Sequence, residues 1–403
     1  MTETGQSTDD GSLSAREIVV IGIVALAVAM GIGRFAFTPL MPLMMRDGSI
    51  DAATGAKWAA ANYAGYLVGS LVASRLGRHP MRNLRWALGC VAASTVLIAF
   101  VTTPIVGGLL RFAAGVFSAW VLVLGSSWCL MRLARQGEGR YGAWIYTGVG
   151  LGIMVAGVLT WLGGEQSARM LWLELGLLAA GGVWYVVRAV ANARDEPVAA
   201  VESTPRQDDR WHAGLVVCYA AFGFGYIVPA TFLPTLARAQ IDDPLVFGLV
   251  WPVFGLASIA SLAIAARTAP TARRRRVWAV AQAVMAVGTG MPAFDRHLWS
   301  LAVGALLVGG TFMITTMAGL QLARELAPAN PTPLLARMTS GFAVGQILGP
   351  VLVWLVAHPM LRGADGVTLT SLVAAALLLL TATWLWRSDG HESRAHGSDS
   401  IAR

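Results

Sequence analysis

A fully charged arginine stands in the middle of an apolar stretch near the start of the chain. Residues 31–44 read GIGRFAFTPLMPLM, and Arg34 lies seventeen residues after Glu17 and twelve before Arg46. An arginine at the centre of a bilayer costs from about 3 to more than 10 kcal/mol, so it normally faces a protein interior or an aqueous cavity and has a partner. Its planar fork of donors suits a carboxylate or phosphate. The sequence therefore predicts that Arg34 binds an anionic substrate, a small organic carboxylate.

A structural alternative for Arg34 stays open. Pro39 and Pro42 follow it, and each proline removes a backbone N–H and frees a carbonyl oxygen that Arg34 could hold instead of a substrate. Acidic residues are scarce inside the apolar segments, where Glu174 is the candidate for proton coupling. Intramembrane carboxyls often form proton relays, although we favour a carboxyl at a helix interface as the interpretation of Glu174.

Other polar and aromatic residues occupy positions from which they could face the same cavity. Helical spacing places Thr38 on the face of Arg34, and Arg111 either lines the cavity or extends toward the outer surface. For each of the others, packing or an interhelical hydrogen bond is the alternative to ligand contact. The predicted substrate-binding residues are Arg34, Thr38, Asn62, Tyr66, Arg111, Tyr146, Tyr226, Trp251 and Gln346.

The elements that must position these residues follow from the composition. Of the 403 residues, only 13% are charged and 56% are hydrophobic, and the mean hydropathy is +0.62. Each hydrocarbon crossing takes about 20 predominantly apolar residues as a helix. Twelve apolar runs lie between residues 18 and 386, so we expect an all-α membrane protein of twelve transmembrane helices. These values exclude a soluble enzyme.

Charge sets the expected orientation of the spans. Basic residues concentrate in the even-numbered loops, including the run Arg273–Arg276, which places those loops and both termini in the cytoplasm. The net charge of +8 therefore reflects topology rather than binding to nucleic acid. The first 17 residues lack the basic start of a secretory signal, so we expect the first span to be retained in the inner (plasma) membrane.

The longest polar connection, which contains two prolines, divides the chain into two halves. We expect a cytoplasmic tail (1–17), an N-terminal six-helix bundle (18–187), a cytoplasmic linker (188–210), a C-terminal six-helix bundle (211–387) and a second cytoplasmic tail (388–403).

An internal repeat relates the halves. GIGRFAFTPLMPLM matches GFGYIVPATFLPTL, residues 223–236, at an offset of 192, and Tyr226 replaces Arg34 in the second copy. A glycine pattern near residue 150 recurs at an offset of 193. Glycine and proline bend helices and let them approach closely. We assign packing or gating to Gly31, Gly33, Pro39, Pro42, Gly148, Gly152, Gly223, Gly225, Pro234, Gly341, Gly345, Gly349 and Pro350.

These features resemble the major facilitator superfamily over the whole chain. SLVASRLGRH, residues 70–79, is similar to the superfamily's loop motif G-x-L-A-D-R-x-G-R-K, with Ser70 and Ser74 in place of its glycine and aspartate, and RFAAG at residues 111–115 resembles its RxxxG element. GIGRFAFTPLMPLM, ANYAGYLVGS and GQILGP resemble the YbfB/YjiJ branch. The loop-motif residues would be Arg75, Gly77 and Arg78.

The resemblance implies a secondary transporter that works by alternating access between its two bundles. We expect a small-molecule substrate, a surrounding bilayer, a monomer, no nucleic acid and no metal or organic cofactor, with protons considered as the coupling ion. One alternative is efflux of hydrophobic or cationic drug-like compounds, although Gly157 is followed by Val158 where drug/proton antiporters pair glycine with proline. A membrane-embedded lipid enzyme or a sensor is a further alternative, but no nucleophile–base pair is evident in the spans.

Overall fold

The computed structural model describes residues 13–76, 79–191, 209–238, 248–268, 273–295, 297–328, 330–356 and 366–401. The first half contains α1 (Ala15–Leu26), α2 (Phe37–Arg46), α3 (Ala52–Ala73), α4 (Pro80–Leu97), α5 (Pro104–Trp120), α6 (Ser126–Arg135), α7 (Thr147–Leu162) and α8 (Ala168–Ala189). The second half contains α9 (Asp209–Arg238), α11 (Val250–Thr268), α12 (Arg274–Phe294), α13 (Leu298–Leu326), α14 (Thr332–Val356) and α15 (Gly366–Ile401).

Several of these elements continue one another as single long helices. A π-helical segment, Ala27–Phe35, joins α1 to α2, and a second one, Val121–Gly125, joins α5 to α6. A 3₁₀ segment, Gly139–Tyr146, leads into α7. Counted in this way, the described residues form twelve long helices, as the apolar runs predict. Most of the predicted linker, residues 192–208, lies outside the described residues.

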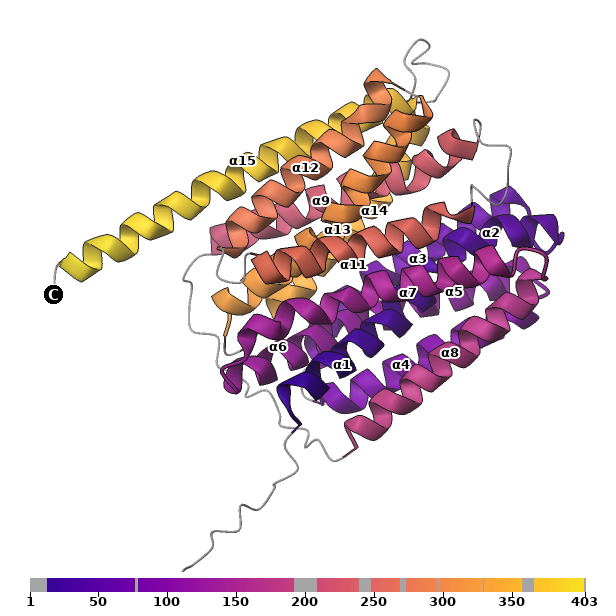
Figure 1. Cartoon of the computed structure of the whole chain (residues 1–403), viewed down its shortest axis with the longest axis horizontal. Coiled ribbons are helices and arrows are strands. Elements are labelled where there is room, and N and C mark those ends of the chain that lie inside the picture. The colour runs from indigo at the N-terminus through magenta and orange to yellow at the C-terminus, as the bar shows by residue number, and fades with distance from the viewer. Residues whose placement is uncertain are drawn as a thin grey trace, which may run out of the picture.

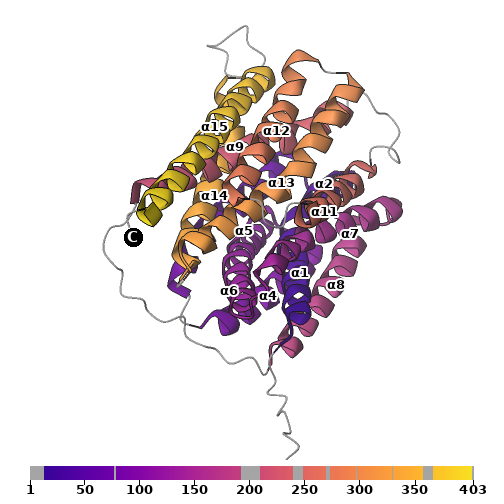
Figure 2. The same ribbon diagram turned by 60° about the vertical axis from the view of Figure 1, so that its left-hand side comes forward.

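The helices form two bundles that lie side by side (Figure 1). α1–α8 make the first bundle and α9–α15 the second, and a second view shows the same division (Figure 2). The most extensive contacts across the boundary in the described chain join α3 to α14 and α7 to α11. The predicted fold class, an all-α membrane protein with two six-helix bundles, is confirmed.

The outer surface suits a lipid environment. Ten helices of the described chain are long and apolar enough to cross a membrane, and large apolar side chains such as Ile105 and Leu177 are about three-quarters exposed, at 77% and 75%. α3 and α14 are not among those ten, and they pack against each other between the bundles. Several of their polar residues, such as Asn62, Ser70 and Gln346, are buried against protein, where a lower hydropathy is tolerated.

The glycine repeat creates matching helix crossings in both bundles. A Cβ on Gly152 would lie 2.4 Å from the Ala27 carbonyl oxygen, and one on Gly345 would lie 2.1 Å from the Ala220 carbonyl oxygen. Ala27 and Ala220 are separated by the same 193 residues as the two glycines. On the facing helix, a Cβ on Gly31 would lie 2.3 Å from the Cα of Gly152. Backbone meets backbone at these crossings, which leaves no room for a side chain.

The other glycines of the pattern are also tightly enclosed. A Cβ would come within 2.1 to 2.9 Å of a neighbouring atom at Gly33, Gly148, Gly223, Gly225, Gly341 and Gly349. Pro42 and Pro350 lie inside α2 and α14, and Pro39 and Pro234 lie within the bounds of α2 and α9.

Candidate functional site

The backbone around Arg34 is irregular, and the sequence explains why. Arg34 is the penultimate residue of the π-helical segment. Gly31 and Gly33 bring no side chains to this segment, and Pro39 lacks the N–H that would pair with a carbonyl one turn earlier. Wider turns of this kind recur at functional sites because they leave backbone groups available and re-aim side chains.

Arg111, on α5, holds the carbonyl groups of this irregular segment. Its Nη1 donates to the Gly33 carbonyl oxygen and its Nη2 to the Arg34 carbonyl oxygen, both at 3.0 Å. Its guanidinium also lies 4.6 Å from the ring centroid of Phe37. Asn62 Nδ2 in turn donates to the Arg111 carbonyl oxygen at 2.9 Å. Arg111 is 4% exposed and therefore extends into the bundle rather than toward the outer surface.

Arg34 uses its side chain differently and reaches the second bundle. The residue is 2% exposed, and its Nη2 donates to Oε1 of Gln346 on α14. The guanidinium lies over the ring of Tyr66, 3.6 Å from the centroid, and 5.5 and 5.9 Å from the rings of Phe35 and Tyr63. Arg34 is thus a contact between the two bundles, made with a neutral amide and aromatic faces.

The charge of Arg34 has no carboxylate partner in the part of the chain that the structure describes. Its Nε and Nη1 also lack a hydrogen-bond partner among the described residues, as does Nε2 of Gln346, which is fully buried. A buried cation normally requires an opposite charge and satisfied donors. The arrangement therefore has unused donors, and its two buried guanidinium groups, Arg34 and Arg111, carry positive charge that a bound anion would match.

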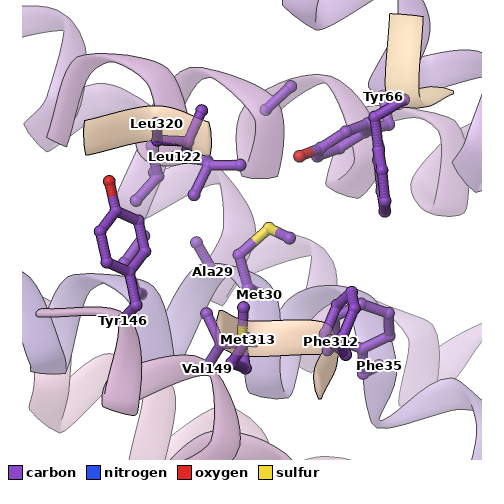
Figure 3. Close-up of a cluster of buried hydrophobic side chains, with 14 of the residues drawn as sticks. Ala29, Met30, Phe35, Tyr66, Leu122, Tyr146, Val149, Phe312, Met313 and Leu320 are labelled. Atoms are coloured by element: carbon purple, nitrogen blue, oxygen red, sulfur yellow. The ribbon is translucent and has the colours of Figure 1, made fainter. Parts of the chain in front are cut away.

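Aromatic side chains from both bundles surround this arginine. Tyr226 on α9 stacks on Phe312 of α13, with centroids 4.2 Å apart and an interplanar angle of 16°. Phe312 meets Phe35 edge-on at 6.1 Å, and Figure 3 shows these two rings side by side. Tyr66 meets Phe342 of α14 at 6.5 Å. The site therefore has its cation from the first bundle and aromatic rings from both bundles.

The remaining predicted site residues lie outside this cluster. Thr38 is exposed, because the π-helical turn changes the face on which residues after Arg34 fall. Tyr146 is fully buried, on the opposite side of Met30 from Phe312 in Figure 3. Trp251 stacks on Phe254 at 5.6 Å. Glu174 is half-buried on α8.

The loop motif is only partly within the described residues. Arg75 is exposed and lies in a 3₁₀ turn, Ser74–Leu76, that follows α3. Gly77 and Arg78 lie outside the described residues.

Four aromatic neighbours of the site were not predicted from the sequence. Phe342 precedes Gln346 by one helical turn, so helical spacing places the two on one face and is the sequence signal for Phe342. Phe35 follows Arg34 directly and Tyr63 follows Asn62, but a helical repeat would turn such neighbours away. Phe312 has no sequence feature that marks it.

Two six-helix bundles related by an internal repeat, with a buried cation at their boundary, define the class of the protein as a transporter of the major facilitator fold. The human organic anion transporter MFSD10 (TETRAN) has a similar structure, with a TM-score of 0.71 and 15% sequence identity over 93% of this chain and 100% of that one. The nucleoside transporter NupG (D323A mutant) has a TM-score of 0.64 and 14% identity over 93% and 99%.

The sequence itself matches the family described as uncharacterised MFS-type transporter YbfB over residues 26–385, and the chain belongs to that family. Comparison with curated proteins gives no significant match. The protein is therefore a multi-pass membrane transporter and not an enzyme.

Proposed function

We propose that this transporter moves a small organic anion, with a carboxylate as the recognised group, and that Arg34 is its anchor. The observation that carries the proposal is a guanidinium, 2% exposed, that meets a neutral amide where an anion would be expected. A carboxylate at this position would supply the missing charge and accept from Nε or Nη1, which are unpaired among the described residues. Both Nη atoms of Arg111 donate to backbone carbonyl oxygens, so Arg111 supports the backbone at Arg34 and is not the proposed anchor.

The bond between Arg34 and Gln346 suggests how binding affects the two bundles. The side-chain amide oxygen of Gln346, Oε1, accepts from one donor of Arg34, as a carboxylate oxygen would. An incoming carboxylate displaces this amide, whose NH₂ group can then donate to the anion after rotation. A contact between the bundles is thereby exchanged for contacts to substrate, which fits transport by alternating access to a central site.

The charge pattern of the loops supports a location and an orientation for the protein. We place the protein in the inner membrane as a monomer with both termini in the cytoplasm. The organic anion transporter named above shares only the fold at 15% identity, so it is consistent with the proposal without carrying it. Proton coupling is included in the proposal, with Glu174 as the residue to test, although its half-buried place on α8 favours an interface role.

The test measures uptake into proteoliposomes and thermal stabilisation of the purified protein by organic acids and by cationic drugs. A ligand of the folded state raises the melting temperature by mass action. We expect carboxylates to stabilise the wild-type protein, and Arg34→Leu and Arg34→Lys to lose this effect and uptake, because lysine lacks the planar fork. Arg337→Gln, at an exposed position of α14, is the matched control.

Two outcomes would contradict the proposal. Unchanged carboxylate uptake by correctly folded Arg34→Leu protein would leave Arg34 a structural role only. Stabilisation by cationic drugs, with none by carboxylates, would favour efflux of cations instead. Under an imposed pH gradient, unchanged uptake by Glu174→Gln would remove Glu174 from proton coupling without affecting the assignment of Arg34.

A further inference from the structure

We propose that the anion held by Arg34 carries an aromatic ring, so that the substrate class is aromatic carboxylates. This inference rests on the proposed function, since it adds a second recognised group to the same site. It comes from the five rings that connect the environment of Arg34 to the second bundle: Phe35, Tyr66, Tyr226, Phe312 and Phe342.

These rings and Arg34 form a closed circuit of contacts. Arg34 lies over Tyr66 at 3.6 Å, Tyr66 meets Phe342 at 6.5 Å, and Phe342 meets Tyr226 at 6.3 Å. Tyr226 stacks on Phe312 at 4.2 Å, Phe312 meets Phe35 at 6.1 Å, and Phe35 lies 5.5 Å from the guanidinium. All five rings are at most 6% exposed. A molecule bound to Arg34 between the bundles has to lie against this circuit.

Within this circuit, the ring contacts inside the second bundle differ from those that cross the boundary. Tyr226 is nearly parallel to both Phe312 and Phe342 within the second bundle, at 16° and 24°. Among the described residues, the two ring contacts that cross the boundary, from Phe35 to Phe312 and from Tyr66 to Phe342, are edge contacts at 84° and 68°. In these edge contacts, the face of one ring does not meet the face of the other. A flat ring inserted at the boundary would gain stacked or edge contacts with both bundles.

One substrate would therefore replace both kinds of contact at the boundary. Its carboxylate takes the place of the Gln346 amide on Arg34, and its ring takes the place of the edge contacts. The internal repeat supports this division, because Arg34 and Tyr226 occupy the same place in the two copies. A site with a cation from the first bundle and aromatic rings on both sides of the boundary matches a molecule with a charged head and a flat apolar body.

The experiment measures binding of three probes to the full-length protein in nanodiscs by titration calorimetry. Benzoate has both groups, cyclohexanecarboxylate has the charge and a similar apolar area without a π face, and benzyl alcohol has the ring without the charge. We expect benzoate to bind about tenfold more tightly than cyclohexanecarboxylate, because aromatic pairs contribute beyond buried area. Benzyl alcohol should bind far more weakly than either acid.

Variants of the ring residues test whether these rings cause the preference for benzoate over cyclohexanecarboxylate. Phe312→Leu and Phe342→Leu retain apolar volume and should lower the affinity for benzoate more than the affinity for cyclohexanecarboxylate, which brings the two affinities together. Phe254→Leu is the matched control, because Phe254 contacts Phe312 at 6.4 Å without belonging to the circuit, and the benzoate preference should survive it.

The outcomes separate this inference from the proposed function. Equal affinities of the two acids for the wild-type protein would overturn the aromatic class while leaving carboxylate recognition intact. A benzoate preference that persists in both Phe312→Leu and Phe342→Leu would overturn the role of the rings. Absence of binding by both acids would overturn the proposed function and this inference together.

Discussion

The same element of the internal repeat has become cationic in one half of the molecule and aromatic in the other. Arg34 and Tyr226 follow matching Gly-x-Gly sequences at an offset of 192, and both are almost fully buried, at 2% and 1% exposure. Arg34 lies in a π-helical segment, whereas Tyr226 lies within the continuous helix α9. Duplication thus supplied a common backbone crossing, and later substitutions gave the two copies different chemistry.

The difference extends beyond the two residues to their surroundings. The first half provides Arg111 to hold the carbonyl groups behind Arg34, whereas the matching place in the second half is occupied by Val303 and Gly304. The second half instead provides Phe312, stacked on Tyr226. The glycine crossings, by contrast, are alike in both halves. Packing is therefore symmetric and recognition is not.

Exchanging Arg34 and Tyr226 is the most direct test of the difference between the two halves. We expect the double variant Arg34→Tyr/Tyr226→Arg to lose uptake by about a hundredfold or more, since losing a buried charge-assisted contact costs about 3 kcal/mol. An arginine at position 226 would lack the support of Arg111 and the Gln346 amide. Uptake in proteoliposomes is the measurement, and recovery of uptake by the exchange would show that the halves are equivalent at this position.

Removing Arg111 tests the support that is specific to the first half. Arg111→Leu leaves two buried carbonyl groups without their donors, so we expect a loss of about 2–4 kcal/mol in the free energy of unfolding. Thermal unfolding in detergent measures the loss. Arg111→Lys should recover part of it, because an ammonium can still donate to one carbonyl, and Arg337→Gln at an exposed site serves as control. A variant as stable as the wild type would contradict this role.

Alanine at the crossings tests the symmetric part of the comparison. Gly152→Ala and Gly345→Ala each place a Cβ within 2.4 Å of a backbone oxygen, so we expect similar losses of about 1–3 kcal/mol. Gly89→Ala is the matched control, because no atom lies within 4 Å of its Cβ position. Melting temperatures report the result. Markedly unequal losses at Gly152 and Gly345 would show that the two crossings are not equivalent.

The smallest effect is expected at a loop contact of the first bundle. Asp47 accepts from the Ala168 N–H at 2.6 Å and pairs with Arg46 at 2.8 Å. Burial raises the pKa of Asp47, but the Ala168 hydrogen bond and Arg46 lower it by more, so its pKa lies below the usual value. Its contribution to stability is therefore present above about pH 4 and lost as the pH falls through the lowered pKa.

We expect Asp47→Asn to lower the free energy of unfolding by about 1 kcal/mol at pH 7, with the difference from wild type vanishing in acid. Melting temperatures as a function of pH measure this, and Glu165→Gln, at an exposed position of a nearby loop, is the control. A difference that stayed constant from pH 7 to pH 3 would refute the assigned pKa direction.

The sequence predicted the features that depend on composition and repetition. The apolar runs of the sequence predict twelve helices. The recurrence of Gly152 as Gly345 reflects the need for a close backbone crossing in each bundle. Burial of Arg34 followed from the cost of a charge in the membrane. Hydropathy, repeats and the cost of a buried charge depend on short or regularly spaced stretches of the chain, so they can be recognised in a single sequence.

The features that the sequence did not predict depend on turn geometry and on contacts between distant helices. A regular α-helix would place Thr38 on the same face as Arg34, but the π-helical segment turns it to an exposed position. Arg111 holds the carbonyl groups of Gly33 and Arg34, a role that no spacing in the sequence indicates. Phe312 joins the site through the packing of α13, which no spacing in the sequence reveals.

The bond between Arg34 and Gln346 has a consequence for the biosynthesis of the protein. The two residues are 312 positions apart, so Arg34 leaves the ribosome long before Gln346 has been synthesised. Arg111, only 77 positions later, can order the nearby carbonyl groups soon after insertion, but it adds a second cation rather than neutralising the first. Until the eleventh helix arrives, the guanidinium must remain hydrated or be sheltered by the insertion machinery, which makes early truncations of this chain poor candidates for stable integration.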